Sequence, residues 1–383
     1  MKIAIIMPLA EQRGGGELAL LNLMQQGNNS GIIWVVVFLE NGPMVKQVRK
    51  MGIEAQVIVS NRLRDVPRTV ATIFSIALLI RLRNIDLVLG WMNQGQLYGS
   101  PAAFLAAVPS VWFQHGIPLV PGWGDRMATR LPAAGILTCS RAGAAAQAAI
   151  APSRPLRVVY PGVELDRFDP SSLPAPADMR RTLGMPVSGP LIGIVGRLQH
   201  WKGMHVLIAA MPEILATHPD AHCVIVGGPH APEPEYPASL TAQISTLGLE
   251  TKVTMVGLQP NVPEWMQAMD VIVHASDHEP FGIVVIEAMA LGKPTIAGNT
   301  AGPTEIITDG VDGLLTPFED APALAHAVKR YLGDPAFAAQ LGAAGRERAQ
   351  EFSTARYAEA VIRETLSLVR PKSGSTLNSG SER

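Results

Sequence analysis

The sequence predicts an α/β protein in which two doubly wound parallel sheets face each other across a cleft. Short apolar runs alternate with longer stretches of helical periodicity along the whole chain, as in repeated βα units. The short runs lack polar alternation, which is typical of strands whose two faces are both covered by helices. With 383 residues the chain exceeds what one hydrophobic core usually serves, so we expect two domains.

Each domain is expected to contain one Rossmann-like parallel sheet with right-handed crossovers. The apolar runs of the first sheet are 2–7, 32–38, 55–59, 87–89, 110–113, 135–138 and 157–160. Those of the second sheet are 191–195, 223–226, 253–256, 271–274, 295–297 and 313–315. Because such sheets bind ligands beyond the carboxyl ends of their strands, we expect the functional site in the cleft between the domains.

Turn-forming residues cluster within 169–189, and we place the domain boundary there. Residues 1–168 form the expected N-terminal domain, and 185–352 form the expected C-terminal domain. A helix over 353–370 follows the last expected strand and is predicted to pack back toward the N-terminal domain. The tail 371–383 is polar and rich in serine and glycine, so we expect it to be disordered.

The composition indicates a well-packed folded protein, with 48% hydrophobic and 16% charged residues. Cys139 and Cys223 lie in apolar, strand-like runs, so we expect two buried, reduced thiols and neither a disulfide nor a metal site. The apolar run 2–7 is too short for a signal peptide, and the longest apolar run, 69–80, is too short to span a bilayer. These features predict a cytoplasmic location.

Charge is distributed unevenly between the two halves of the chain. Residues 1–167 carry 16 Lys and Arg against 9 Asp and Glu, a net charge of +7, whereas the remainder has a net charge of −8. The apolar run 69–80 has basic flanks, which fits either a core helix with solvated ends or a peripheral contact with an anionic surface, such as an inner membrane. The flanking basic residues are Arg62, Arg64, Arg68, Arg81 and Arg83. A nucleic-acid partner is not expected.

The segment from Glu279 to Glu287 is the most informative motif of the chain. Two carboxylates frame Pro280-Phe281-Gly282 and the beginning of an apolar helical stretch. Gly282 allows a sharp turn, so the first amides of the helix can face outward and bind an anion. The carboxylates suit neutral, hydroxyl-rich groups of the same ligand. This combination is typical of a nucleotide-sugar site.

Two further motifs supply a close-approach turn and two cations. Gly14-Gly15-Gly16 separates the first strand from a helix expected to begin near Glu17, and it is either an anion-binding turn or a flexible turn. It does not have the spacing of the dinucleotide fingerprint. Arg197 and Lys202 follow the first strand of the second domain. Each alone fits a solvated loop cation, but together they can neutralise a diphosphate.

These motifs together resemble those of the retaining glycosyltransferases of family 4, also called glycosyltransferase group 1, which have the GT-B fold. The resemblance extends from residue 2 to about residue 368. The matching segments are 14–17, 160–168, 196–197 with 202–203, 279–288, 292–294, 302–305 and 309–313. Each motif is weak alone, whereas their order and spacing are specific.

The resemblance implies a role for each candidate residue. Arg197 and Lys202 would hold the donor diphosphate, Glu287 the ribose and Glu279 the transferred sugar, while His115 would face that sugar. The implied catalytic residues are thus Glu279, Arg197, Lys202 and His115. The implied donor-binding residues are Gly15, Gly16, Gly196, Arg197, Lys202, Gly257, Phe281, Gly282, Ile283 and Glu287, and the N-terminal domain would bind the acceptor.

The expected function is transfer of a hexose, with retention, from a nucleoside diphosphate donor (UDP or GDP) to a sugar, lipid-linked or small-molecule acceptor in carbohydrate biosynthesis. Paired carboxylates could act as in glycosidases, but the family implies that the leaving phosphate takes the acceptor proton. No Asp-x-Asp motif occurs, so no metal and no cofactor are expected. The alternatives are a nucleotide-sugar epimerase or hydrolase on this fold, and a non-catalytic nucleotide-sugar-binding protein.

Two interpretations remain open both for Glu305 and for three tryptophans of the first domain. Glu305 either caps a helix or contacts the ligand. Trp91, Trp112 and Trp123 lie near strand ends of the first domain, where they either pack in the core or stack on an acceptor sugar.

Overall fold

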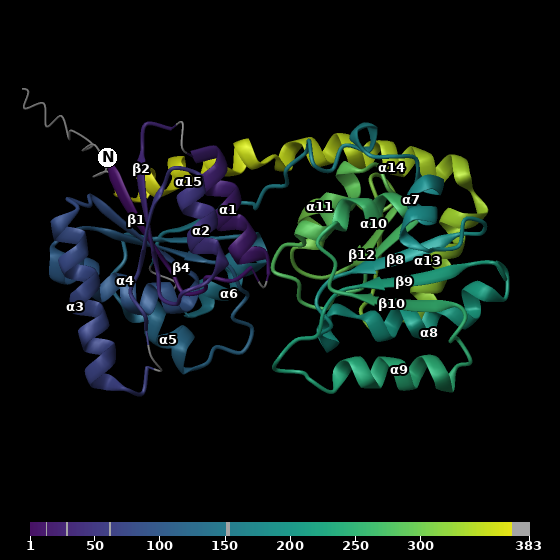
Figure 1. Ribbon diagram of the computed structural model, residues 1–383, viewed down its shortest axis with the longest axis horizontal. Helices are drawn as coiled ribbons and strands as arrows, with labels where there is room; N and C mark the ends of the chain where they lie inside the picture. The colour runs from purple at the N-terminus through teal and green to yellow at the C-terminus, as the bar shows by residue number, and fades with distance from the viewer. Residues whose placement is uncertain (13, 28–29, 61–62, 151–153, 370–383) are drawn as a thin grey trace, which may run out of the picture.

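The protein consists of two α/β domains that lie side by side in the computed structural model (Figure 1). The structure describes residues 1–12, 14–27, 30–60, 63–150 and 154–369. The first domain has a seven-stranded sheet in the order β3-β2-β1-β4-β5-β6-β7, and the second has a six-stranded sheet in the order β10-β9-β8-β11-β12-β13. All pairings within these sheets are parallel, which confirms the predicted pair of doubly wound sheets. The expected tail 371–383 and Arg62 lie outside the described residues.

Every strand expected from the sequence is present, with ends that differ by two residues at most. The first sheet contains β1 (Lys2–Met7), β2 (Ile33–Phe38), β3 (Glu54–Val57), β4 (Leu87–Trp91), β5 (Ser110–Gln114), β6 (Ile136–Thr138) and β7 (Leu156–Val158). The second contains β8 (Leu191–Val195), β9 (His222–Val226), β10 (Val253–Gly257), β11 (Val271–His274), β12 (Thr295–Gly298) and β13 (Leu314–Thr316). The central strands are buried along their whole length because helices cover both faces.

Helices follow the strands in βα order. The first domain has α1 (Gly15–Gly27), α2 (Pro43–Lys50), α3 (Val66–Leu82), α4 (Met92–Ala106), α5 (Trp123–Arg130) and α6 (Arg141–Ile150). The second has α7 (Pro176–Leu183), α8 (Met204–Leu215), α9 (Tyr236–Thr246), α10 (Val262–Ala268), α11 (Ile283–Ala290), α12 (Pro303–Ile306), α13 (Ala321–Gly333) and α14 (Pro335–Ala349). The last described helix is α15 (Thr354–Val369). Three short 3-10 helices are η1 (Pro170–Ser172), η2 (His200–Lys202) and η3 (Gln350–Phe352).

The segment between the two sheets contains α7, where the sequence indicated only turns. Pro176 occupies the first helical position, and Gly184 ends the helix with a left-handed φ of 69°. These are ordinary start and stop signals of a helix, so the proline and glycine marked the helix ends and not only a linker. Met179 packs into a core cluster of the second domain, and the Arg180 guanidinium donates to the carbonyl of Ala268. Helix α7 is therefore part of the second domain.

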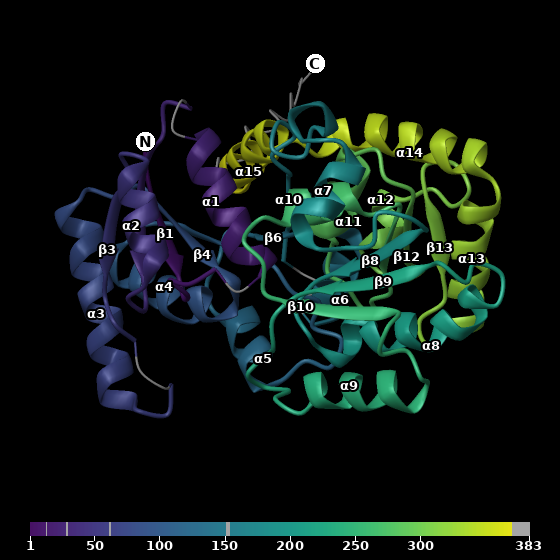
Figure 2. The same ribbon diagram turned by 45° about the vertical axis from the view of Figure 1, so that its right-hand side comes forward.

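The chain returns to the first domain through α15. Tyr357, Ala358 and Val361 of this helix pack in the core of the first domain, and the helix lies against α1 (Figure 2). Where the chain crosses back, the N–H of Val163 donates to the carbonyl of Phe352 at 2.8 Å, and the N–H of Thr354 donates to the carbonyl of Val163 at 3.1 Å. The two crossing segments therefore hold each other directly.

In the described part of the chain, no helix combines the length and the apolar character that crossing a membrane requires.

Gly162 should be needed where the two crossing segments meet. A Cβ at this position would lie 2.7 Å from the carbonyl oxygen of Ser353, which is backbone and cannot rotate away. We expect Gly162→Ala to lower the free energy of unfolding by about 1–3 kcal/mol in urea denaturation. The control is Gly124→Ala in α5, where a Cβ would meet nothing within 4 Å. Equal stability of the two variants would contradict this assignment.

Candidate functional site

The carboxyl ends of both sheets open onto one cleft with a volume of about 970 Å³. Residues from both domains line it, as expected for a site between two doubly wound sheets. Of the residues predicted for the site, the cleft brings together Gly15, Gly16, His115, Gly196, Arg197, Lys202, Glu279, Phe281, Gly282, Ile283 and Glu287. Gly257 is set back at the end of β10, where its φ of 71° turns the chain so that Leu258 and Gln259 line the cleft.

The glycine turn of the first domain faces the second domain across the cleft. Helix α1 begins at Gly15, two residues before the expected start, so Gly15 and Gly16 form its first turn. A Cβ on Gly14 would lie 3.4 Å from Nη2 of Arg197, and one on Gly15 would lie 3.3 Å from Cδ1 of Ile283. The absence of side chains here leaves room for a ligand between the turn and the opposite wall.

A buried ion pair occupies the second domain's side of the cleft. Nζ of Lys202 contacts Oε2 of Glu279, and the same oxygen lies 3.1 Å from Nε2 of His274. Burial opposes ionisation of Glu279, but the Lys202 ammonium and the His274 contact outweigh it and hold the pKa of that carboxyl well below its usual range. Glu279 is therefore a carboxylate at any physiological pH. His274 lies at the end of β11 and was not among the predicted residues.

The ammonium of Lys202 is also held from its other side. Its Nζ lies 4.2 Å from the ring centroid of Trp201, which in turn stacks on His278. Only 14% of the Lys202 side chain is exposed. The lysine is thus positioned in advance, and an anionic ligand in the cleft could replace Glu279 as its partner.

Helix α11 begins in the cleft directly after Gly282. This glycine has a φ of 106° and a ψ of 56°, a left-handed conformation that side chains other than glycine rarely adopt. The first intrahelical bond of the turn runs from the N–H of Val285 to the carbonyl of Gly282, so the preceding amides of Ile283 and Val284 point outward at the positive end of the helix. The N–H of Gly302 donates to the carbonyl of Glu279 at 3.0 Å and braces this turn.

Glu287 lies in the same helix but in a different electrostatic environment. Its side chain is 7% exposed, and burial raises its pKa to about 7, against a lowering by Arg167 and with a further raising by Glu164. A carboxyl that is neutral for part of the time can both accept and donate hydrogen bonds, as hydroxyl groups require. Arg167 and Glu164 belong to the segment 160–168, whose part in this environment the sequence did not reveal.

His115 follows β5 and packs against two aromatic rings. Its ring centroid is 4.5 Å from that of Trp91 and 4.1 Å from that of Phe113, and burial lowers its pKa to about 3. The imidazole is therefore neutral. Its Nε2 has no hydrogen-bond partner among the described residues, although it belongs to a side chain that lines the cleft. A buried polar atom without a partner requires an explanation, and its place in a cleft-lining side chain makes a ligand contact one such explanation.

The sequence is similar to known proteins over much of its length. Residues 177–348 match the family described as Glycosyl transferases group 1. The matched segment lies in the second domain, which is therefore similar to that of the group 1 glycosyltransferases. The curated D-inositol 3-phosphate glycosyltransferase of Corynebacterium urealyticum is 37% identical over 185 residues, which are 47% of this chain and 43% of that protein. The lipopolysaccharide core biosynthesis mannosyltransferase LpsB of Rhizobium meliloti is 27% identical over 219 residues, 56% of this chain and 62% of that protein. The chain spans about half the length of the curated relatives it matches.

Solved structures extend the likeness to both domains. HepE of Anabaena, solved in complex with UDP, has a TM-score of 0.84 and 26% identity, and the match covers 96% of this chain and 100% of that chain. The same protein was also solved with UDP-glucose. A glycosyltransferase of Rickettsia africae matches with a TM-score of 0.85 at 22% identity, over 96% of this chain and 98% of that chain. The chain therefore has the predicted GT-B fold.

Glu305 connects the two domains. Its carboxylate accepts hydrogen bonds from the N–H groups of Arg141 and Ala142 at 2.8 and 3.0 Å, and from the hydroxyl of Tyr160 at 2.9 Å. Burial and then the Glu305 contact raise the pKa of Tyr160 to about 12, so the phenol stays protonated and donates. Glu305 thus caps α6 of the opposite domain.

Burial decides between the two interpretations of the three tryptophans. Trp91 and Trp112 are fully buried, whereas Trp123 at the start of α5 is 64% exposed. Stacking on a sugar is therefore possible for Trp123 alone among these three. Both cysteines are free and buried, as predicted.

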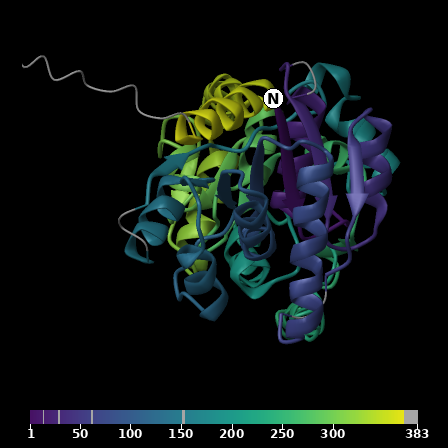
Figure 3. The same cartoon turned by 90° about the vertical axis from the view of Figure 1, so that its left-hand side faces the viewer.

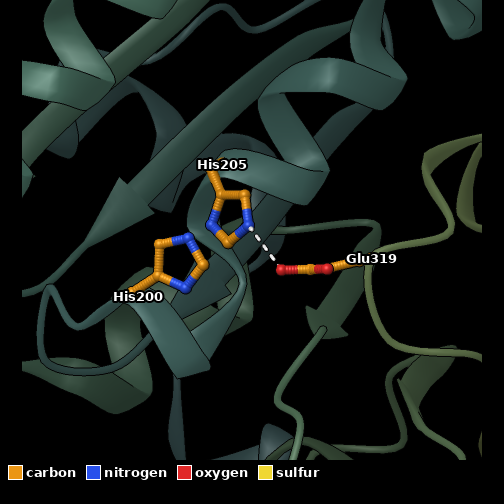
Figure 4. A group of neighbouring side chains, drawn as sticks. All are labelled: His200, His205 and Glu319. Carbon is orange, nitrogen blue, oxygen red and sulfur yellow. Dashed lines mark ion pairs between the residues drawn. The ribbon is translucent and has the colours of Figure 1, made fainter.

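One group of side chains outside the cleft lining could hold a metal ion. Among the described residues, His200, His205 and Glu319 place their ligand atoms within 4.8 Å of one another (Figure 4). Nε2 of His205 lies 4.0 Å from Oε1 of Glu319, and its Nδ1 lies 2.9 Å from the hydroxyl of Tyr236. None of the three lines the cleft, so an ion there would not touch a ligand between Arg197 and α11.

Glu287 should produce a specific pH dependence of stability. Its pKa is raised to about 7 in the folded state, so the stability that the protonated carboxyl confers is complete below the unfolded pKa and is lost as the pH rises through 7. Glu287→Gln lacks this loss. Its free energy of unfolding relative to that of the wild type should therefore rise by on the order of 3 kcal/mol as the pH increases from roughly 4 to 8. Urea denaturation across this range measures the difference. With the exposed Glu359→Gln as control, a gain no larger than that of the control would contradict the raised pKa.

Glu305→Ala should destabilise the protein without weakening ligand binding. The substitution leaves two helix amides and one phenol without their acceptor, at a cost of about 1–3 kcal/mol. Tyr160→Phe removes only the phenol and should cost less. Thermal unfolding and nucleotide titration of both variants separate the two roles of Glu305. A loss of nucleotide affinity at unchanged stability would show that Glu305 contacts the ligand instead.

Proposed function

We propose that this protein is a retaining glycosyltransferase that needs no metal and moves a hexose from a nucleoside diphosphate donor to a sugar, lipid-linked or small-molecule acceptor. One observation carries the proposal. Two cations, an open helix N-terminus and two carboxyls with opposite pKa shifts face the same cleft. Each matches a different part of a nucleotide sugar. UDP is the nucleotide we propose, because the structurally similar HepE was solved with UDP and UDP-glucose.

The diphosphate would bind between Arg197, Lys202 and the first amides of α11. Arg197 offers a planar fork to two phosphate oxygens, and Lys202 offers a point charge. Lys202 contacts Glu279 before the donor arrives, so a phosphate of the donor would replace this carboxylate as the partner of the lysine. Glu287, on the same helix as these amides, would accept hydrogen bonds from the ribose hydroxyls. A metal ion is not needed for charge balance, because the protein supplies two cations and a helix dipole.

Release of Lys202 from Glu279 would leave a carboxylate free to accept hydrogen bonds from hydroxyls of the transferred sugar. The Lys202 and His274 contacts keep Glu279 ionised before the donor binds, so it meets the donor as a hydrogen-bond acceptor and not as an acid. His115 cannot donate a proton as a general acid either, since its imidazole is neutral with a pKa of about 3. Its unpaired Nε2 would instead form a hydrogen bond with the sugar. These residues hold and orient the donor without moving its protons.

In the transfer step, the bond between the anomeric carbon and the diphosphate oxygen breaks, and the acceptor hydroxyl oxygen forms the new bond on the same face. The departing phosphate oxygen takes the acceptor's proton, so the configuration is retained and no protein base is required. Negative charge grows on the diphosphate as it leaves. Arg197, Lys202 and the α11 dipole would stabilise that charge most strongly in the transition state.

A panel of UDP-, GDP- and ADP-sugars in thermal-shift measurements tests the donor, because a ligand that binds the folded state raises the unfolding temperature. We expect the UDP-sugars to give the largest shift. With the donor identified, product analysis with candidate acceptors, in the presence of a chelator, separates transfer from epimerisation and hydrolysis. Turnover that stops on chelation would contradict the metal-independent mechanism.

Lys202→Ala and Glu279→Ala should each lower the turnover number about 100-fold or more, because both side chains act on charge or orientation in the reacting complex. The matched control is Lys252→Ala, because this lysine donates to the carbonyl of Pro219 and does not line the cleft. Steady-state rates at saturating donor measure the effect. Unchanged turnover with intact donor binding in both variants would show that the site is assigned wrongly.

A further inference from the structure

Helix α3 exposes a continuous apolar stripe on its outer face. Large apolar side chains recur every four residues along it, and each is between 44% and 69% exposed. They are Val66, Val70, Phe74, Leu78 and Leu82. Residues four apart are neighbours on a helix surface, so these side chains form a stripe that winds slowly around α3, with Val70, Phe74 and Leu78 at its centre on the outer face. Figures 1 and 3 show α3 on the side of the first domain that faces away from the second domain.

The opposite face of α3 already provides its attachment to the domain. Thr72, Ile76, Ala77 and Ile80 are buried there, and Ile76 and Ile80 belong to a core cluster with residues of β1, β2 and α4. The outer stripe therefore does not contribute to the fold. Soluble monomers rarely expose a contiguous apolar surface of this kind unless a partner covers it.

The apolar surface continues onto the end of α4. Nη2 of Arg81 donates to the carbonyl of Leu105 at 2.5 Å, which fixes the last turns of α3 and α4 beside each other. Phe104 is 70% exposed and Leu105 is 37% exposed at this end. The two helices together thus present an apolar surface to the outside.

Arginines lie near both ends of the stripe, and no charged residue lies in its central part from Val70 to Leu78. The residues from 69 to 80 are all uncharged, whereas Arg64 and Arg68 precede them and Arg81 and Arg83 follow. Asp65 pairs with Arg68, and Glu54 pairs with Arg83, so two of the four arginine charges are balanced within the protein and the helix ends keep a net positive charge. The half of the chain that contains α3 has a net charge of +7.

We propose that α3 lies flat on an anionic phospholipid surface. The apolar stripe would enter the boundary between headgroups and acyl chains, and the arginines at its two ends would meet lipid phosphates. A second copy of this chain is a poorer partner, because antiparallel pairing of two α3 helices would place the arginines of one copy against those of the other. The proposal concerns this surface and does not depend on the reaction assigned to the cleft.

Flotation of the full-length protein with vesicles tests the proposal. We expect the wild type to float with phosphatidylcholine vesicles that contain phosphatidylglycerol and to stay behind with phosphatidylcholine alone. Phe74→Ser/Leu78→Ser should weaken partitioning at least about tenfold, because two apolar side chains no longer enter the lipid. Leu247→Ser/Val311→Ser is the matched control, since it removes two exposed apolar side chains of the second domain. This control should float like the wild type.

Three results would overturn the proposal. The first is that the wild type does not float with anionic vesicles, and the second is that Phe74→Ser/Leu78→Ser floats as well as the wild type. The third is that the wild type forms a dimer without lipid and that Phe74→Ser/Leu78→Ser does not. A thermal shift with UDP on every variant shows that each is folded, because neither substituted pair touches the cleft. A wild type that floats as expected but does not respond to any nucleotide would contradict the proposed function and leave the docking surface standing.

Discussion

The site depends on holding two carboxyl edges opposite each other. Each parallel sheet places all its strand ends at one edge, but a cleft forms only if the two domains are fixed with these edges facing. The chain crosses between the domains twice, at Val163 and again at Phe352 to Thr354, and the two crossings are hydrogen-bonded to each other. Glu305 adds a third connection by capping α6 of the opposite domain. None of these residues lines the cleft, and hinge rotation about such crossings is a common way for the walls of a two-domain cleft to approach each other.

Electrostatic asymmetry within one short segment gives the cleft its chemistry. Glu279 and Glu287 are both buried, yet the pKa of the first is lowered and that of the second is raised. The difference arises from their partners, since Glu279 has a cation and a histidine on one oxygen, whereas Glu287 has mainly desolvation. A pair of carboxyls that titrate far apart is typical of groups with separate tasks. Here the charge of Glu279 balances that of Lys202, whereas Glu287, which can be protonated or ionised near neutral pH, suits neutral hydroxyl groups.

The sequence predicted the strands and most of the cleft because both follow from local patterns. Apolar runs of strand length gave all the strands, and the carboxyl-edge rule then brought Gly15, Arg197 and Glu279 together. Side-chain partners did not follow in the same way. Glu305 lies at the start of α12, yet it caps α6, which is more than 160 residues away along the chain. His274 was assigned to a strand, and only the geometry of β11 shows that its ring reaches Glu279. Contacts of this kind depend on the relative position of elements, which residue spacing does not encode.

Helix α3 shows how two interpretations of one apolar run can both hold. The uncharged run from 69 to 80 fitted a core helix or a membrane contact, and a helix that is apolar all round needs apolar partners on every side. Ile76 and Ile80 satisfy the core on one face, and Phe74 and Leu78 emerge on the other. A helix serving only the core would carry polar residues at those outer positions at no cost in stability, since they touch no core cluster. The outer stripe is thus the part of α3 that folding does not explain, and its arginine-flanked ends match the charge of an anionic lipid surface.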